Sequence, residues 1–149
     1  MKYLNQMTLT LPSLSKNEAF ARSVVAAFCA QLNPTVEEIN DIKTAVSEAV
    51  TNCVVHGYNG TTGEITVWAA LTKDHIYVRI SDHGIGIPDV KKAIQPFYTT
   101  KPQEERSGMG FTVMQAFMDE CKVTSKPGAG TEVLLSKRIG SAEDLVDHA

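Results

Sequence analysis

Two pairs of alternating segments, each closed by a short turn, constrain the fold of this chain more than any other feature. Apolar residues alternate with polar or small ones over residues 65–71 and again over 76–80, with a turn at 72–75 between them. A second pair flanks the Lys126-Pro-Gly-Ala-Gly130 turn. Strands joined by so short a connection pair antiparallel, because a parallel neighbour needs a long crossover. The sequence therefore predicts a sheet with much antiparallel pairing.

An opening strand and a helix precede these pairs. Apolar residues and threonines alternate over residues 7–11, and Pro12 ends the predicted strand. Ser15 and Glu18 match a capping box, which predicts that a helix begins there. That helix carries an apolar stripe at four-residue steps, formed by Phe20, Val24, Phe28 and Leu32.

A second helix follows the break at Asn33-Pro34. Thr35 and Glu38 form another capping box at its start. Apolar residues then continue at helical spacing and stop before Gly57. Four of them form one stripe along the helix: Ile42, Val46, Val50 and Cys53.

The rest of the chain predicts a short helix near residues 89–94, a loop and a further helix over 111–120. Residues 95–107 contain prolines, threonines and charges with little periodicity, which indicates a mobile loop. We expect a polar, disordered tail from about residue 140. The most economical arrangement is a single domain over residues 1–149. Its expected fold is a two-layer α/β sandwich, with a mixed, mostly antiparallel sheet and helices on one face.

The composition excludes several classes of protein. The chain has 149 residues, of which 43% are hydrophobic and 21% charged, as in an ordinary globular domain. Its net charge of −3 argues against a direct nucleic-acid binder. No apolar run approaches the roughly 20 residues of a membrane helix, and residues 1–13 lack the apolar region of a signal peptide. Three scattered cysteines indicate buried free thiols in a reducing cytoplasm and no cysteine metal site: Cys29, Cys53 and Cys121.

The second helix has a polar row opposite its apolar stripe, formed by Thr44, Glu48, Asn52 and His56. The ordinary interpretation of such a row is a solvated helix face. The alternative is a face that meets a ligand, because an asparagine oxygen suits Mg²⁺ when phosphates and water supply the other ligands. A glutamate one turn away can then accept a hydroxyl proton.

Two glycine-bearing segments lie further along the chain. Asp82 ends an apolar strand and leads into Gly84-Ile-Gly86, and Ser107-Gly-Met-Gly110 precedes a helix. Plain turns have similar patterns. However, glycines let a backbone approach a flat ring or a phosphate, a carboxylate accepts the exocyclic amine of adenine, and helix N-termini bind anions. The motifs of P-loop proteins, α/β-hydrolases, eukaryotic kinases and zinc proteases are missing from the sequence.

The order of these segments resembles the conserved boxes of the gyrase, histidine kinase and mismatch-repair ATPase superfamily, which has the Bergerat fold. The matching boxes are Glu48-x-x-x-Asn52, Asp82-x-Gly84-x-Gly86, Gly108-x-Gly110 and Gly130-Thr131. Within that superfamily, the anti-sigma F factors of spore-forming bacteria are similar in further segments, namely 17–22, 25–28, 47–52, 56–59, 96–102 and 105–111. The resemblance covers nearly the whole chain.

The resemblance implies a role for each matching residue. Glu48 would be the general base toward a serine hydroxyl, and Asn52 would hold Mg²⁺ and, through it, the phosphates of ATP. Asp82 would bind the adenine amine, with help from Thr131 through a water. Four glycines would let the loops wrap the nucleotide: Gly84, Gly86, Gly108 and Gly110.

The resemblance also implies that residues 95–107 form a lid over the ATP. Residues within this lid or just after it would contact the nucleotide: Thr100, Lys101, Arg106, Ser107 and Met109. Arg106 would also approach a partner protein, and Arg22 would lie in the surface that binds a sigma factor. The plain alternative for these cations is a solvated surface charge.

The implied function has two parts. The chain would inhibit the sporulation sigma factor F as a homodimer, and it would phosphorylate an anti-anti-sigma antagonist on serine with Mg-ATP. A chain of 149 residues leaves no room for the phospho-accepting hairpin of a histidine kinase, so the acceptor is expected on another protein. Three alternatives stay open: a stress sigma factor as the target, a non-catalytic module switched by nucleotide, and a stand-alone ATPase or chaperone-like fragment.

Overall fold

A five-stranded sheet forms one layer of the computed structural model, which describes residues 2–58, 61–87 and 110–140. The strand order is β1-β2-β3-β5-β4, and every neighbouring pair is antiparallel. The strands are β1 (Asn5–Pro12), β2 (Glu64–Leu71), β3 (His75–Asp82), β4 (Glu120–Lys126) and β5 (Gly130–Arg138). Both hairpins predicted from the sequence are therefore confirmed.

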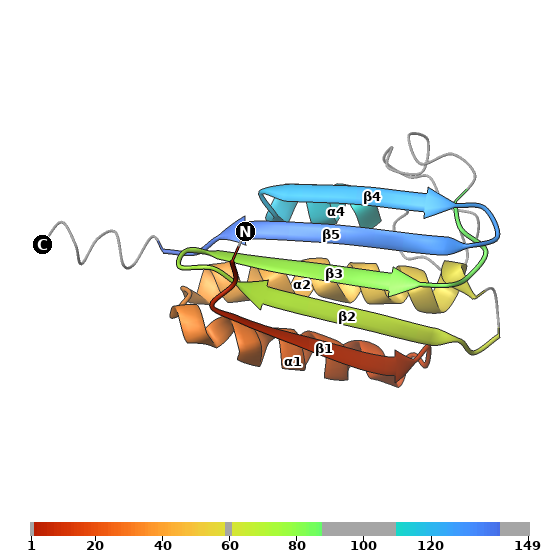
Figure 1. Cartoon of the computed structure of the whole chain (residues 1–149), viewed down its shortest axis with the longest axis horizontal. Helices are drawn as coiled ribbons and strands as arrows, with labels where there is room; N and C mark the ends of the chain where they lie inside the picture. Colours follow the sequence, from red (N-terminus) through yellow and green to blue (C-terminus); the bar gives the residue numbers. More distant parts are fainter. Residues whose placement is uncertain (1, 59–60, 88–109, 141–149) are drawn as a thin grey trace, which may run out of the picture.

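Helices form the second layer and cover one face of the sheet (Figure 1). In the described residues they are α1 (Lys16–Cys29), α2 (Val36–Asn52) and α4 (Gly110–Phe117). α2 contacts α1 on one side and α4 on the other. A 3₁₀ turn, η1 (Ala30–Leu32), follows α1, and a π-helical turn, η2 (Cys53–Gly57), continues α2. The predicted two-layer α/β sandwich is confirmed.

The core lies between these two layers. Alternation along β2 and β3 turns every second side chain toward the helices, and these are buried: Ile65, Val67, Ala69, Ile76, Val78 and Ile80. The stripe predicted on the second helix faces them, and each of its members is at most 5% exposed: Ile42, Val46, Val50 and Cys53. None of the helices in the described segments has both the length and the apolar character that a bilayer crossing requires.

The packing of α1 differs from its predicted stripe. The buried row consists of Ala21, Val25 and Cys29, whereas Phe20 is 51% exposed and Phe28 is only partly buried. α1 packs against α2 as well as β1 and β2, and small side chains allow such close approach on more than one side. The predicted helix is confirmed, but its predicted stripe flanks the core face: Phe28 and Leu32 pack against the edge of the core, and Phe20 is exposed.

The two predicted capping boxes also differ. Thr35 has an extended backbone, so its Oγ1 accepts the N–H of Glu38 at 3.1 Å while Glu38 Oε1 accepts the N–H of Thr35 at 2.8 Å. Ser15 has helical backbone angles (φ −54°, ψ −38°), and its side chain makes no cap hydrogen bond. Glu18 instead lies 3.5 Å from Arg22. The capping box of Thr35 and Glu38 is therefore confirmed at the start of α2. The capping box predicted from Ser15 and Glu18 at the start of α1 is wrong.

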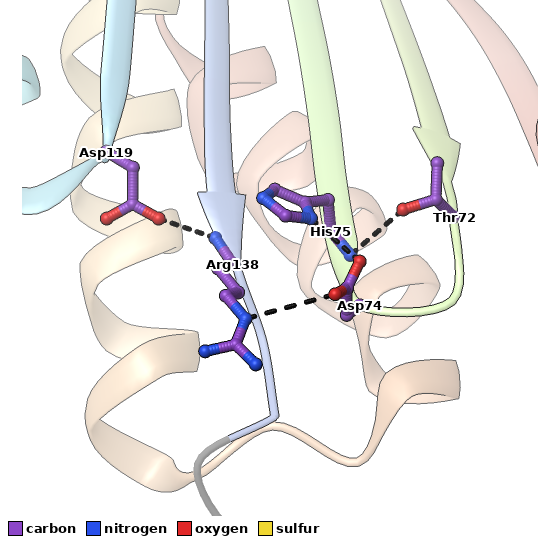
Figure 2. Close-up of polar contacts among 5 residues, drawn as sticks. All are labelled: Thr72, Asp74, His75, Asp119 and Arg138. Atoms are coloured by element: carbon purple, nitrogen blue, oxygen red, sulfur yellow. Dashed lines mark hydrogen bonds and ion pairs between the residues drawn. The ribbon is translucent and has the colours of Figure 1, made fainter. Parts of the chain in front are cut away.

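A polar cluster joins the end of β5 to the β2–β3 turn (Figure 2). Asp119 Oδ2 accepts the N–H of Arg138 at 2.6 Å, and the Arg138 guanidinium lies 3.9 Å from Asp74. Asp74 Oδ1 is 2.8 Å from His75 Nδ1, and Thr72 Oγ1 accepts the His75 N–H at 3.1 Å. The hydrogen bond from His75 lowers the pKa of Asp74. This cluster lies at the opposite end of β3 from the glycine-rich loop.

Candidate functional site

Asp82 is the centre of the contacts at the carboxyl end of β3. It is the last residue of that strand and only 5% exposed. Its Oδ1 accepts the N–H of Gly84 at 2.9 Å and the N–H of Thr131 at 3.2 Å. One carboxylate therefore joins the loop after β3 to the start of β5, and three predicted site residues meet there.

The loop after β3 lies so close to its neighbours that two positions exclude a side chain. A Cβ on Gly84 would lie 1.7 Å from the carbonyl oxygen of Gly57, and the Ile85 N–H donates to that same oxygen at 2.7 Å. Gly86 has a φ of +77°, and a Cβ there would lie 2.2 Å from the Lys126 carbonyl oxygen. The loop is held between η2 and the β4–β5 turn, which explains both glycines.

Ser125 belongs to the same network, although the sequence did not single it out. Its Oγ accepts the N–H of Ile87 at 2.7 Å and donates to the Gly130 carbonyl at 3.0 Å. It also lies 2.8 Å from the Thr131 hydroxyl. Ser125 therefore orients the hydroxyl of Thr131, a predicted site residue. A serine before a hairpin turn carries no sequence signal for this role.

Glu48 and Asn52 reach this end of the molecule through α2. Both are half-buried, as are the other two members of the polar row. Asn52 is the last residue of α2, and η2 follows it directly. η2 contacts β3 and β5, and Figure 1 shows the end of α2, the end of β3 and the β4–β5 turn at one end of the molecule. Single π-helical turns are frequent at functional sites.

An open surface pocket of about 300 Å³ lies beside Glu48, where Arg22 of α1 approaches α2. Its lining residues are Arg22, Asn40, Lys43, Thr44, Ser47 and Glu48. The structure thus brings the predicted partner-binding Arg22 and the predicted base Glu48 to one pocket. The sequence did not single out Asn40, Lys43 or Ser47, because helical periodicity alone does not show which turns of α2 lie beside Arg22.

Several predictions fall outside the described residues. They concern the short helix at 89–94, the lid at 95–107, the tail from 141 and six site residues: Thr100, Lys101, Arg106, Ser107, Gly108 and Met109. Gly110 is described, and it begins α4 as a buried residue. Among the described residues, no group of three or more histidine, cysteine or acidic side chains could hold a metal ion.

The chain is similar to known proteins over most of its length. Residues 11–137 match the family model of the histidine kinase-like ATPase domain. An anti-sigma F factor of Thermoanaerobacter pseudethanolicus is 59% identical over 95% of this chain and 99% of that protein. Anti-sigma F factors of Clostridium acetobutylicum and Bacillus licheniformis are 48% and 50% identical, over 94% and 95% of this chain and 98% and 97% of theirs.

A solved structure has the same fold. The crystal structure of the RsbU and RsbW domains of a Mycobacterium tuberculosis protein superposes with a TM-score of 0.64 at 23% identity. The match covers 91% of this chain and 32% of that longer one, and at this identity it concerns the fold alone. By the family match and the near full-length identity to its relatives, the chain belongs to the histidine kinase-like ATPase domain family, in the group formed by the anti-sigma F factors.

Proposed function

We propose that this chain is an ATP-dependent protein serine kinase that also inhibits a sigma factor. The names of its relatives support the inhibitory half, and the histidine kinase-like ATPase domain supports the use of a nucleotide. The observation that carries the use of ATP is the buried Asp82 carboxylate, which joins the glycine-bearing loop after β3 to Thr131 in β5. The kinase half rests on Glu48, which lies on α2 four residues before Asn52, as in the box that the sequence shares with the superfamily.

Asp82 is the proposed adenine-binding residue. Both backbone donors bind its Oδ1, which leaves Oδ2 to accept the exocyclic amine of adenine. Guanine has an oxygen at that position, and two acceptors would repel each other. The Thr131 hydroxyl lies on the next strand of the same network and would add a water-mediated contact. The glycines at 84 and 86 let this loop pack against η2 and the β4–β5 turn, which sets the place of the loop beside Asp82.

Asn52 is the proposed ligand of Mg²⁺. Its amide oxygen fits an ion that takes one or two protein ligands and completes its shell with phosphates and water. When bound, Mg²⁺ would neutralise charge on the phosphates of ATP. The predicted phosphate and lid contacts remain proposals: Thr100, Lys101, Arg106, Ser107, Gly108, Met109 and Gly110.

Glu48 is the proposed general base. The hydroxyl oxygen of a partner serine forms a bond to the γ-phosphorus of ATP, the bond to the bridging oxygen breaks, and ADP leaves. The serine proton passes to the Glu48 carboxylate. The proposed partners are the sigma factor, bound through Arg22 by a homodimer, and an anti-anti-sigma protein that carries the acceptor serine.

The kinase half is tested with purified protein, Mg-ATP and the cognate anti-anti-sigma protein. We expect serine phosphate with the wild type, and Glu48→Gln should lower the transfer rate by 10²–10⁴-fold, as roughly expected for loss of a general base. ATP affinity should change less than about threefold, since Glu48 is not assigned to the nucleotide. Glu37→Gln, an exposed glutamate on the same helix, is the matched control and should transfer normally.

Two results would contradict the kinase proposal. Wild-type protein that binds ATP but forms no serine phosphate would support the non-catalytic switch instead. Persistent transfer by Glu48→Gln would remove Glu48 from the role of base. The inhibitory half needs a separate assay, in which sigma F and a stress sigma factor compete for the protein in the presence of ATP or ADP. Failure to bind either sigma factor, with ATP or with ADP, would contradict it.

A further inference from the structure

Ser125 lies on β4 directly opposite Thr131 on β5, and its hydroxyl has three partners. Its Oγ is 2.7 Å from the Ile87 nitrogen, 3.0 Å from the Gly130 carbonyl oxygen and 2.8 Å from the Thr131 hydroxyl. Thr131 in turn donates its N–H to Asp82, the proposed adenine-binding carboxylate. Ser125 is therefore bonded directly to a residue that is proposed to help bind the base.

The place of each hydroxyl proton follows from these partners. A serine hydroxyl has one proton and two lone pairs. The Gly130 carbonyl only accepts, so Ser125 donates to it, and the Ile87 N–H occupies one lone pair of Ser125 Oγ. The second lone pair remains for Thr131, which therefore donates its own hydroxyl proton to Ser125. In the reverse arrangement, the Ser125 and Gly130 oxygens would lie 3.0 Å apart with no proton between them.

This assignment decides what the Thr131 hydroxyl can offer a ligand. With its proton directed at Ser125, Thr131 Oγ1 presents only lone pairs to any other group. The ring nitrogen N1 of adenine, next to the exocyclic amine, is also an acceptor, so these two atoms cannot bond directly. One water has two protons and can donate one to each acceptor. The polarity of Thr131 therefore favours a water-mediated contact with N1, beside the amine that Asp82 is proposed to accept.

We propose that Ser125 is a positioning residue for base recognition: by accepting the Thr131 proton, it holds Thr131 as the acceptor for a water that bridges to adenine N1. The inference rests on the proposed ATP site and adds to it the residue that sets the polarity of the Thr131 contact. Ser125 acts only through Thr131 and is assigned no contact with the nucleotide.

The Kd values of two nucleotides, measured by calorimetry with Mg²⁺ present, test this role. The probes are ATP and 1-deaza-ATP, in which a C–H group replaces N1 and the amine is kept. Wild-type protein should bind ATP about fivefold more tightly, which is the scale of one neutral hydrogen bond. Ser125→Ala removes the acceptor and Ser125→Cys replaces it with a weak one, so in either variant the preference should fall to about twofold or less. Ser125→Thr keeps the hydroxyl and should keep the wild-type preference.

A double-mutant cycle with Thr131→Val separates this role from a purely structural one. Thr131→Val removes the hydroxyl, keeps the branched shape and should abolish the preference for ATP. In that background, Ser125→Ala should not change the ratio of the two Kd values any further. Thr124→Ala is the matched control, because Thr124 is an exposed hydroxyl residue one position earlier on β4, and it should keep the preference.

The outcomes distinguish the inference from the ATP site on which it rests. Equal weakening of both nucleotides by Ser125→Ala and Ser125→Cys would overturn the inference alone, because the loss would not involve N1. Loss of the preference in Ser125→Thr would overturn it as well. Wild-type protein that binds ATP without any preference would refute the Thr131 contact together with the inference. Wild-type protein that binds no ATP would refute the proposed site itself, and that outcome is visible without any variant.

Discussion

The Asp82 carboxylate and the glycines around it show how single residues build this site. A buried carboxylate needs donors, and here they come from backbone N–H groups on two separate segments. The Gly84 N–H reaches the carboxylate from a loop that lies against the Gly57 carbonyl, with no room for a Cβ at position 84. The site is therefore as sensitive to an added methyl group as to a lost charge.

A substitution at Gly84 should be far more costly than one at another loop glycine. In Gly84→Ala, the new Cβ meets the backbone oxygen of Gly57 at 1.7 Å, so the loop must move. We expect a loss of about 3 kcal/mol in the free energy of unfolding, measured by urea denaturation. In Gly128→Ala, nothing lies within 4 Å of the Cβ, and only the φ of +79° is unfavourable, at about 1 kcal/mol. Equal losses in the two variants would contradict the close approach.

At the scale of elements, the two helix starts show that one sequence pattern can have two outcomes. Both α1 and α2 begin with a hydroxyl residue followed three positions later by glutamate. Only Thr35 has the extended backbone that aims its hydroxyl at the third N–H of the helix. At α1, Ser15 is itself helical, and Glu18 is drawn toward Arg22 instead.

The caps therefore predict different costs for two alanine substitutions. Thr35→Ala removes a complete capping box and should lower the free energy of unfolding by about 1 kcal/mol. Ser15→Ala removes a side chain that makes no cap hydrogen bond, so its effect should stay below about 0.5 kcal/mol. Urea denaturation of the two variants measures both losses in the free energy of unfolding. A larger loss for Ser15→Ala than for Thr35→Ala would show that the α1 cap forms in solution.

At the scale of the whole molecule, the two-layer architecture keeps the thiols away from water. Cys29 and Cys53 are buried and Cys121 is partly buried, and all three are free. Burial raises the pKa of Cys29 to about 12 and that of Cys121 to about 11, from an ordinary value of 9.0. The folded protein therefore holds these protons at a pH at which the unfolded chain releases them.

This difference predicts a loss of stability at alkaline pH. A thiol whose pKa is raised by folding stabilises the fold fully below pH 9, and that contribution is lost as the pH rises from about 9 to about 12. At pH 10, a buried thiol such as Cys29 should account for about 1 kcal/mol of the loss relative to pH 8. Urea denaturation at both pH values measures it, and Cys29→Ala should show a loss smaller by about that amount. An unchanged loss in this variant would assign the effect to other groups.

Much of this protein was determined by local sequence patterns. Strand alternation, the hairpin turns and the α2 stripe with its Thr35 cap all follow from residues within a few positions of one another, and the structure confirms them. The boxes around Asp82 and Thr131 also named two residues that the structure joins by a hydrogen bond. Local patterns sufficed because backbone geometry and burial of one face decide these elements.

Only the tertiary structure decided how the elements meet. Which row of α1 faces the core depends on the close packing of α1 with α2. Smaller side chains occupy the core-facing row, and Phe20 lies outside it. The pocket shared by Arg22 and Glu48 and the hydrogen bond from the Thr131 N–H to Asp82 join segments that are far apart in sequence. No periodicity records such contacts, because they depend on where two rigid elements come to rest against a common sheet.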